Sequence, residues 1–369
     1  MPRSESFAIR LDDEVLDDLR ARLRNTRWPA PSPSPAWEQG TDLEYLRELV
    51  GYWADGFDWR AQEERLNAFA HFRTEIDGVG IHFVHERARN GDGIPLILSH
   101  GWPSSFVEHL QIAPLLAETF DVVIPSLPGY GFSDRPTHNT TRDTARLWHG
   151  LMRSLGYERY GAQGGDFGAS VTTYMALDDP APLLGIHLHQ IDDTPYTGPG
   201  SRPLSDAERE YTAAVAGWDA VERGYSSIQS TKPQTVGYAL NDSPAGLAAW
   251  LIEKWRSWSD SLESIDRDGL LTNLTIFWTT QTITGSMRDY YDERWHGTQM
   301  GPDDFVSVPT AVSLFANELV SEGTPPREWA ERLYDIRRWT LMPRGGHFAP
   351  AEQPELIARD ITEFFTGLR

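Results

Sequence analysis

The sequence contains no cysteine among its 369 residues. This absence excludes disulfide bonds, thiolate metal sites and a cysteine nucleophile, and it fits a reducing or an oxidising compartment equally well. Basic residues are also scarce, because 33 Lys and Arg stand against 54 Asp and Glu, which gives a formal net charge of -21. A chain of this charge does not track a phosphate backbone, so we expect no nucleic-acid partner.

Long apolar runs are missing as well. Residues 1–18 contain no run of signal-peptide length, and no segment approaches the roughly 20 apolar residues of a membrane-spanning helix. We therefore expect a soluble, cytoplasmic protein. Aromatic residues, in contrast, are plentiful, with 14 Trp, 13 Tyr and 15 Phe. They suit a hydrophobic ligand tunnel, although a well-packed core of this size can also contain them.

Several catalytic and ligand-binding signatures are absent from the sequence. There is no G-x-S-x-G, no H-E-x-x-H and no Walker loop. His187 and His189 alternate on one face of an expected strand, where local packing or hydrogen bonding is the favoured role, and His82 and His85 point to opposite faces. We therefore expect neither a metal nor a cofactor.

The start of the chain has helical patterns. Apolar residues at helical spacing between residues 11 and 23 predict an amphipathic helix, and Asp12 and Asp13 suit its N-terminus. A second helix is expected over 43–53, and a short third helical region begins at Phe57. These segments predict an N-terminal helical collar.

From His71 onward the patterns are those of a sheet. Two alternating runs over 71–86 flank an Asp-Gly pair, which predicts a β-hairpin. Strands and helices then alternate, which predicts a mostly parallel sheet with helices on both faces. The expected strands are 94–99, 121–126, 159–163, 183–189, 306–315 and 339–342, and the expected helices are 141–155, 168–177, 326–333 and 351–365.

The alternation stops after Ile191 for roughly a hundred residues of helical pattern. We interpret this segment as a mainly helical cap inserted into the sheet domain. The predicted organisation is a collar (1–70), the first part of the α/β core (71–191), the cap (192–302) and the second part of the core (303–369).

A turn between an expected strand and helix carries a carboxylate. Gly164-Gly165-Asp166-Phe167-Gly168 has the spacing of a nucleophile elbow, in which small residues surround an exposed nucleophile. The usual serine is replaced by Asp166. Alone, such a pentapeptide is more often a simple turn.

Three further elements complete a triad with an oxyanion hole, in the chain order of an α/β-hydrolase. The loop His100-Gly101-Trp102-Pro103 follows an early strand, so that the backbone N–H groups of Trp102 and Phe167 could hold an oxyanion. Glu318 follows the strand that ends at Phe315, and His347 lies in a Gly-rich loop after the last strand. All four features lie at strand ends on one edge of the sheet. The predicted fold class is therefore the α/β-hydrolase fold.

An aspartate nucleophile changes the reaction. The carboxylate is ionised at neutral pH and can attack an sp³ carbon, leaving an ester. His347 would then activate a water that hydrolyses this ester, with Glu318 orienting the ring. A halide would leave without help, whereas a strained ether oxygen needs a proton or strong hydrogen-bond donors, such as tyrosine hydroxyls.

These motifs resemble those of the microsomal-type epoxide hydrolases, and the resemblance runs almost from end to end of the chain. It is carried by Tyr52-Trp53, Phe57-Asp58-Trp59, His71-Phe72, Ile81-His82-Phe83, His100-Gly101-Trp102-Pro103, Gly164-Gly165-Asp166-Phe167-Gly168, residues 229–237, residues 239–244, residues 246–249, Trp278-Thr279-Thr280 and residues 344–348. The resemblance implies hydrolysis of a hydrophobic epoxide to a vicinal diol, with the epoxide and water as the small-molecule partners.

The resemblance also implies roles for cap residues. Two tyrosines would donate to the epoxide oxygen, and the matching positions are Tyr225 and Tyr290, with Tyr291 as a rival for the second. Trp102, Phe167 and Trp278 would contact the substrate. Membrane-bound family members carry an apolar anchor before the collar, whereas this chain begins in the collar, so we expect no membrane anchor.

The same residues also fit two other functions. A haloalkane dehalogenase would use the same Asp and His, although such enzymes usually place Trp after the nucleophile, where this chain has Phe167. A non-catalytic ligand-binding member of the fold is the second alternative, since fold alone does not fix function. The sequence also leaves open which epoxide is the substrate, the regio- and stereoselectivity, and the oligomeric state, a homodimer included.

Overall fold

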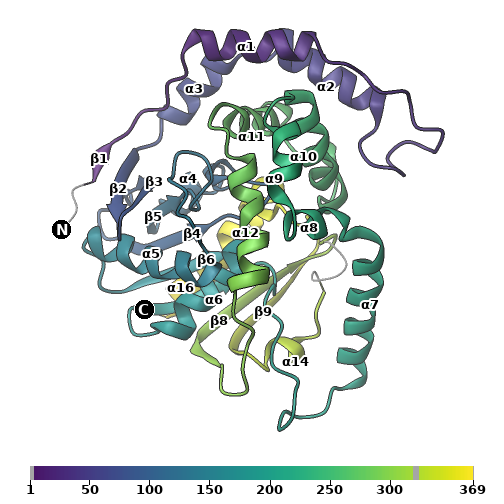
Figure 1. The fold of residues 1–369 in the computed structure, drawn as a ribbon. Coiled ribbons are helices and arrows are strands. Elements are labelled where there is room, and N and C mark those ends of the chain that lie inside the picture. The colour runs from purple at the N-terminus through teal and green to yellow at the C-terminus, as the bar shows by residue number, and fades with distance from the viewer. Residues whose placement is uncertain (1–3, 319–323, 369) are drawn as a thin grey trace.

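The computed structural model describes residues 4–318 and 324–368, and one nine-stranded sheet lies at its centre (Figure 1). The strand order is β1-β2-β3-β5-β4-β6-β7-β8-β9. The strands are β1 (Glu5–Ser6), β2 (His71–Ile76), β3 (Val79–Glu86), β4 (Ile94–Ser99), β5 (Phe120–Pro125), β6 (Tyr160–Gly164), β7 (Leu183–Leu188), β8 (Val306–Phe315) and β9 (Tyr334–Met342). Neighbours from β5 to β9 pair in parallel, while β1, β2 and β3 form an antiparallel edge.

The predicted hairpin is confirmed. β2 and β3 pair from His71 opposite Val84 to Ile76 opposite Val79. The turn residues Asp77 and Gly78 have φ angles of 50° and 81°, the left-handed conformation that a two-residue hairpin turn requires.

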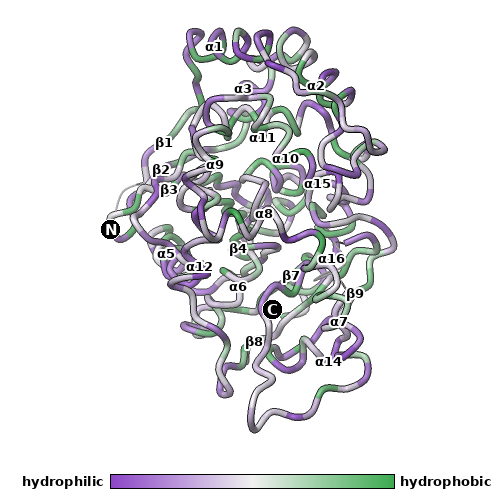
Figure 2. Tube along the Cα trace, turned by 45° about the vertical axis from the view of Figure 1, so that its right-hand side comes forward, coloured by the Kyte–Doolittle hydropathy of each residue, from purple (hydrophilic) through white to green (hydrophobic). Residues whose placement is uncertain are grey.

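Three helices form the beginning of the chain: α1 (Asp13–Arg24), α2 (Leu43–Asp55) and α3 (Trp59–Asn67). In Figure 1 they form an arc over the helices between β7 and β8. Hydrophilic and hydrophobic residues alternate along α1 in Figure 2, and its buried residues are Leu16, Leu19 and Leu23. The amphipathic pattern of the sequence therefore corresponds to one helix face turned toward the protein.

Helices cover both faces of the sheet, as expected from the alternation of elements. The core helices are η1 (a 3-10 helix, Phe106–Leu110), α4 (Ala113–Leu116), α5 (Thr141–Ser154), α6 (Phe167–Asp178), α14 (Arg327–Ala330), α15 (Ala349–Glu352) and α16 (Pro354–Thr366). Between β7 and β8 lie α7 (Asp206–Glu222), α8 (Gly224–Gln229), α9 (Pro233–Leu240), α10 (Pro244–Trp258), η2 (a 3-10 helix, Leu262–Ser264), α11 (Arg267–Thr279) and α12 (Ile283–His296). The domain bounds given above stay a prediction.

Three details of the sequence prediction were wrong. The helix expected over 326–333 is only the single turn α14, and β9 begins at Tyr334, five residues before the expected strand. The charged residues Arg337 and Arg338 interrupt the apolar pattern that would indicate a strand. Arg338 is accommodated in β9 because it forms an ion pair with Asp360 of α16 at 2.6 Å. The closing helix expected over 351–365 is divided into α15 and α16, because Pro354 lacks the N–H that a continuous helix needs.

None of the helices in the described ranges combines the length and the apolar character needed to cross a bilayer.

Candidate active site

Asp166 lies at the turn between β6 and α6. Its backbone has φ 52° and ψ -136°, which is unusual for a residue other than glycine. The turn is so tight that a Cβ on Gly164 would overlap the backbone of Gly168. A Cβ on Gly101 would likewise overlap the Asp166 side chain, so glycine is required where this loop approaches the carboxylate.

Two backbone N–H groups hold one oxygen of this carboxylate. Asp166 Oδ1 accepts from the N–H of Trp102 at 2.8 Å and from its neighbour Phe167 at 2.7 Å. Trp102 lies in the loop after β4, and Phe167 is the first residue of α6. The predicted oxyanion-hole donors therefore converge on a single point, and the nucleophile's own oxygen occupies it.

The other oxygen faces an imidazole. His347 Nε2 lies 3.4 Å from Asp166 Oδ2, and His347 Nδ1 lies 2.9 Å from Glu318 Oε1. Glu318 follows β8, and His347 follows β9. The structure thus brings together the three residues that the sequence placed at three separate strand ends.

The charges around His347 determine its protonation. Burial on its own would lower the pKa of the imidazole, but the Glu318 charge and hydrogen bonds to Asp166 and Glu318 outweigh burial and raise this pKa well above its ordinary value. The ring therefore carries a proton in the resting enzyme. An ester on Asp166 would remove the charge of that side chain and lower the pKa of His347 again.

Gln190 is a site residue that the sequence analysis missed. The side-chain oxygen of Gln190 accepts a hydrogen bond from the backbone N–H of Asp166. Its Nε2 donates to Glu318 Oε1 at 2.9 Å and also lies next to Nδ1 of His347. The side chain is buried and links the elbow directly to the acid. No motif marks it, although it follows β7 at the same sheet edge as the triad.

The two predicted tyrosines lie beside the elbow. The Tyr225 ring stacks on Trp102 at 5.3 Å between centroids, and the Tyr290 ring contacts Phe167 edge-on at 4.8 Å. Both tyrosines and Asp166 line a cavity of about 980 Å³. Burial, the neighbouring Tyr225 and the Asp166 charge raise the pKa of Tyr290 well above its ordinary value, so its hydroxyl keeps its proton.

Two other aromatic residues lie elsewhere. Tyr291 is 36% exposed and packs near Trp295, at 6.2 Å between ring centroids, and it does not line this cavity. Trp278 of α11 is also outside the cavity lining, because its ring faces the Arg22 guanidinium of α1 at 5.7 Å. The structure does not bring Trp278 to the site where the sequence analysis expected a substrate contact.

A second, small cavity lies beside Asp166 and His347. Its volume of about 10 Å³ is at the lower limit for holding one water molecule. Asp166, His347, Gln190 and Glu108 all contribute to its wall. Burial raises the pKa of Glu108 to about 7. Sequence reasoning missed Glu108, whose only signal is its position shortly after the loop that carries Trp102.

The four histidines singled out in the sequence each form a hydrogen bond with another side chain. His187 contacts Asp360 at 3.0 Å, and His189 contacts Gln163 at 2.8 Å. His82 bonds to Ser126, whereas His85 bonds to Tyr157, each at 2.9 Å.

Comparisons with known proteins agree with this geometry. The family described as "Epoxide hydrolase N terminus" matches residues 4–109, and the family described as "alpha/beta hydrolase fold" matches residues 94–293. Epoxide hydrolase 1 of Oryctolagus cuniculus is 37% identical, over 97% of this chain and 88% of the relative.

Solved structures show the same relationship. The juvenile hormone epoxide hydrolase of the silkworm Bombyx mori has a TM-score of 0.91 at 29% identity, covering 100% of this chain and 95% of that one. The Aspergillus niger epoxide hydrolase has a TM-score of 0.86 at 31% identity, covering 100% and 97%. The turn that carries Asp166 fits these relatives, and the sequence match extends along nearly the whole chain. The protein therefore belongs to the epoxide hydrolase family of the α/β-hydrolase fold.

Proposed function

We propose that the protein converts a hydrophobic epoxide to a vicinal diol through an ester on Asp166. The observation that carries this proposal is the division of labour between the two oxygens of one carboxylate. Oδ1 is held by the N–H groups of Trp102 and Phe167, while Oδ2 faces His347. Oδ2 is therefore the attacking atom, and Oδ1 becomes the ester carbonyl, already seated where negative charge will develop.

In the first step, Oδ2 attacks an epoxide carbon and the C–O bond of the ring breaks. The alkoxide that forms accepts hydrogen bonds from Tyr225 and Tyr290, whose rings contact those of Trp102 and Phe167. The alkoxide takes up one proton, and His347 gives up the proton that it carries in the resting enzyme. Formation of the ester removes the Asp166 charge and so favours the neutral imidazole.

In the second step, neutral His347 takes a proton from water, and the resulting hydroxide attacks the ester carbonyl. The tetrahedral oxyanion forms on Oδ1 between the two N–H groups. Collapse of this intermediate releases the diol and restores the Asp166 carboxylate beside a protonated His347. We place the hydrolytic water in the small cavity that Asp166, His347 and Glu108 line.

The function is tested by incubating the protein with aliphatic, aryl and lipid-like epoxides and scoring diol formation by mass spectrometry. We expect diol from at least one hydrophobic class, because aromatic rings line the large cavity beside the nucleophile. Asp166→Asn is the matched control and should form no diol. Chloride release from a chloroalkane, without diol from any epoxide, would instead support the dehalogenase alternative.

Gln190 is proposed as a positioning residue for the second step. In Gln190→Met, which keeps a similar volume, we expect ester hydrolysis to slow about tenfold, or ~1.4 kcal/mol on the barrier, because Glu318 loses its amide donor. Ester formation should change less, since Trp102 and Phe167 still hold Asp166. Single-turnover rates of ester formation and decay measure the two steps separately. Equal slowing of both steps would assign Gln190 a general structural role instead.

A further inference from the structure

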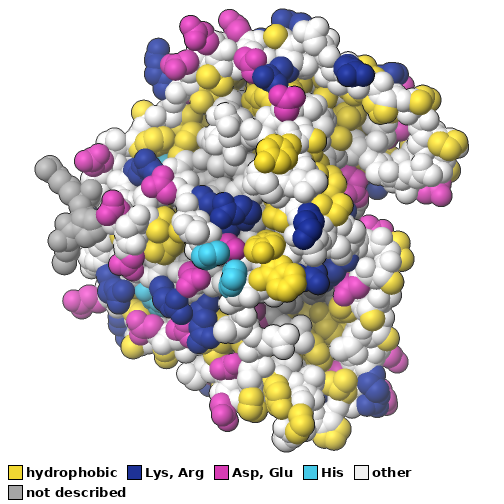
Figure 3. Space-filling view, viewed as in Figure 1, with side chains coloured by type: hydrophobic (Ala, Val, Ile, Leu, Met, Phe, Trp, Pro, Cys, Tyr) yellow, Lys and Arg dark blue, Asp and Glu magenta, His cyan; other side chains and the backbone are white. Residues whose placement is uncertain are grey.

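The chain contains eleven histidines, all within the described ranges, and nine of them are buried. The two exposed ones, His138 and His296, lie next to each other, with 4.8 Å between ring centroids. Figure 3 shows histidine side chains together near the middle of this face. Their proximity is notable because they come from distant parts of the sequence, a loop before α5 and the last residue of α12.

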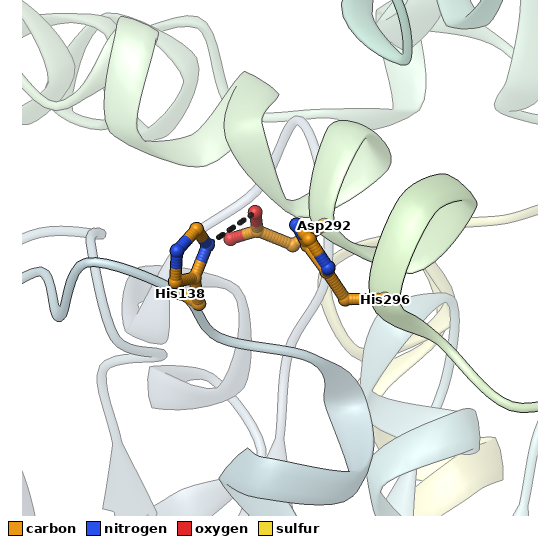
Figure 4. Close-up of side chains that lie close together, drawn as sticks. All are labelled: His138, Asp292 and His296. Atoms are coloured by element: carbon orange, nitrogen blue, oxygen red, sulfur yellow. Dashed lines mark ion pairs between the residues drawn. The ribbon is translucent and has the colours of Figure 1, made fainter.

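A buried carboxylate lies beside both imidazoles. Asp292 is one helical turn before His296 on α12, so the two side chains share a face of the helix. His138 Nδ1 lies 3.8 Å from Asp292 Oδ1 (Figure 4). One ligand atom from each of the three residues lies within 4.8 Å of the other two.

The second oxygen of Asp292 is held from behind. Oδ2 accepts from Arg135 Nη2 at 2.7 Å and from the backbone N–H of Asn139 at 3.0 Å. Arg135 also forms an ion pair with Asp289. The positive charge of Arg135 is therefore divided between two carboxylates and does not neutralise Asp292 alone. These contacts fix the Asp292 carboxylate with Oδ1 toward the histidines. Carboxylates that bind metal ions are typically held in place by such hydrogen bonds.

We propose that His138, Asp292 and His296 bind a late first-row divalent metal ion such as zinc. Two imidazoles and a carboxylate are ligands that zinc accepts, at distances of about 2.0–2.2 Å, with water completing the coordination. Ligand atoms around such an ion lie about 3.3–3.5 Å apart. The side chain of His138 is 64% exposed and His296 is exposed too, so small rotations of both bring the ligands to this spacing. The C-terminal end of α12 also favours a cation.

The ion would connect two parts of the molecule. His138 belongs to the loop between β5 and α5, whereas α12 also carries Tyr290 on the wall of the large cavity. Binding to the folded state alone would stabilise this contact, so the melting temperature should rise with zinc concentration. This role is independent of the epoxide chemistry.

The test uses the full chain freed of metal with a chelator. Titration with Zn²⁺ alone should give saturable binding of one ion, and Co²⁺ should give a visible absorption band that reports its ligands. We expect His138→Gln and His296→Gln each to weaken zinc binding at least tenfold and to remove the cobalt band. Tyr291→Phe, a change beside Asp292 without a ligand atom, is the matched control and should bind like the wild type.

Both histidines are exposed, so the metal-free variants should melt at the wild-type temperature. Zinc binding that is equal in the wild type and in both histidine variants would overturn the proposal, as would the absence of saturable binding to the wild type.

Discussion

In His347→Gln, mixing with a saturating epoxide should give a protein whose intact mass is increased by one substrate mass. Ring opening is an addition, so nothing is lost when Asp166 Oδ2 forms the ester. Hydrolysis then stalls, because no base takes the proton from water, and we expect turnover to fall by about 10²–10⁴-fold. Tyr225 and Tyr290 remain in place to stabilise the alkoxide. Intact-mass spectrometry after a single mixing measures the adduct directly.

Two controls make this result specific. Asp166→Asn combined with His347→Gln should remain at the unmodified mass, because the nucleophile is gone. Digestion of the modified single variant should place the added mass on the peptide that contains Asp166. A folded His347→Gln protein that stays unmodified at saturating epoxide would argue against the two-step scheme.

Local motifs made much of the site predictable. The elbow around Asp166 depends on neighbouring glycines, because a Cβ on Gly164 would overlap the backbone of Gly168, and a Cβ on Gly168 would overlap the backbone of Ser99. His347 likewise lies in a Gly-rich loop. The order of the strands then brings these loops to one sheet edge. These features could be predicted from the sequence because the glycines that the turns require lie within a few residues of the reactive side chains.

Other features depend on contacts that sequence spacing does not contain. Gln190 belongs to no motif, and its significance appears only when its amide reaches both Asp166 and Glu318. The choice between Tyr290 and Tyr291 also required coordinates, because adjacent residues point in directions about 100° apart around a helix. The cluster of His138 with Asp292 and His296 was invisible for the same reason, since helix α12 supplies only two of its members.

Trp278 shows a different limit. Its motif contributes to the family resemblance, but its ring packs toward Arg22 of the N-terminal helix α1. A residue within a family motif can therefore pack between helices and not contact the substrate. Burial does not distinguish these two roles, because Trp278 is buried, whereas its absence from the residues that line the large cavity does.

Replacing both tyrosines in Tyr225→Phe/Tyr290→Phe should reduce the rate of ester formation by about 10²–10⁴-fold, the range that general acids supply. Each single variant should lose about ten- to hundredfold, because one hydrogen bond to a charged oxygen contributes about 1.5–3 kcal/mol. The Phe rings keep the packing on Trp102 and Phe167, so the melting temperature should change little. Rapid quenching followed by intact-mass analysis measures ester formation.

Tyr291→Phe is the matched control, because Tyr291 is on the same helix but outside the cavity. It should form the ester at the wild-type rate. If the double variant also formed ester at that rate, neither tyrosine would act on the epoxide oxygen. If only Tyr291→Phe were slow, the donor would lie on the other face of α12. The expected pattern, slow ester formation in the double variant with unchanged folding, requires that the proton donors and the nucleophile face one cavity.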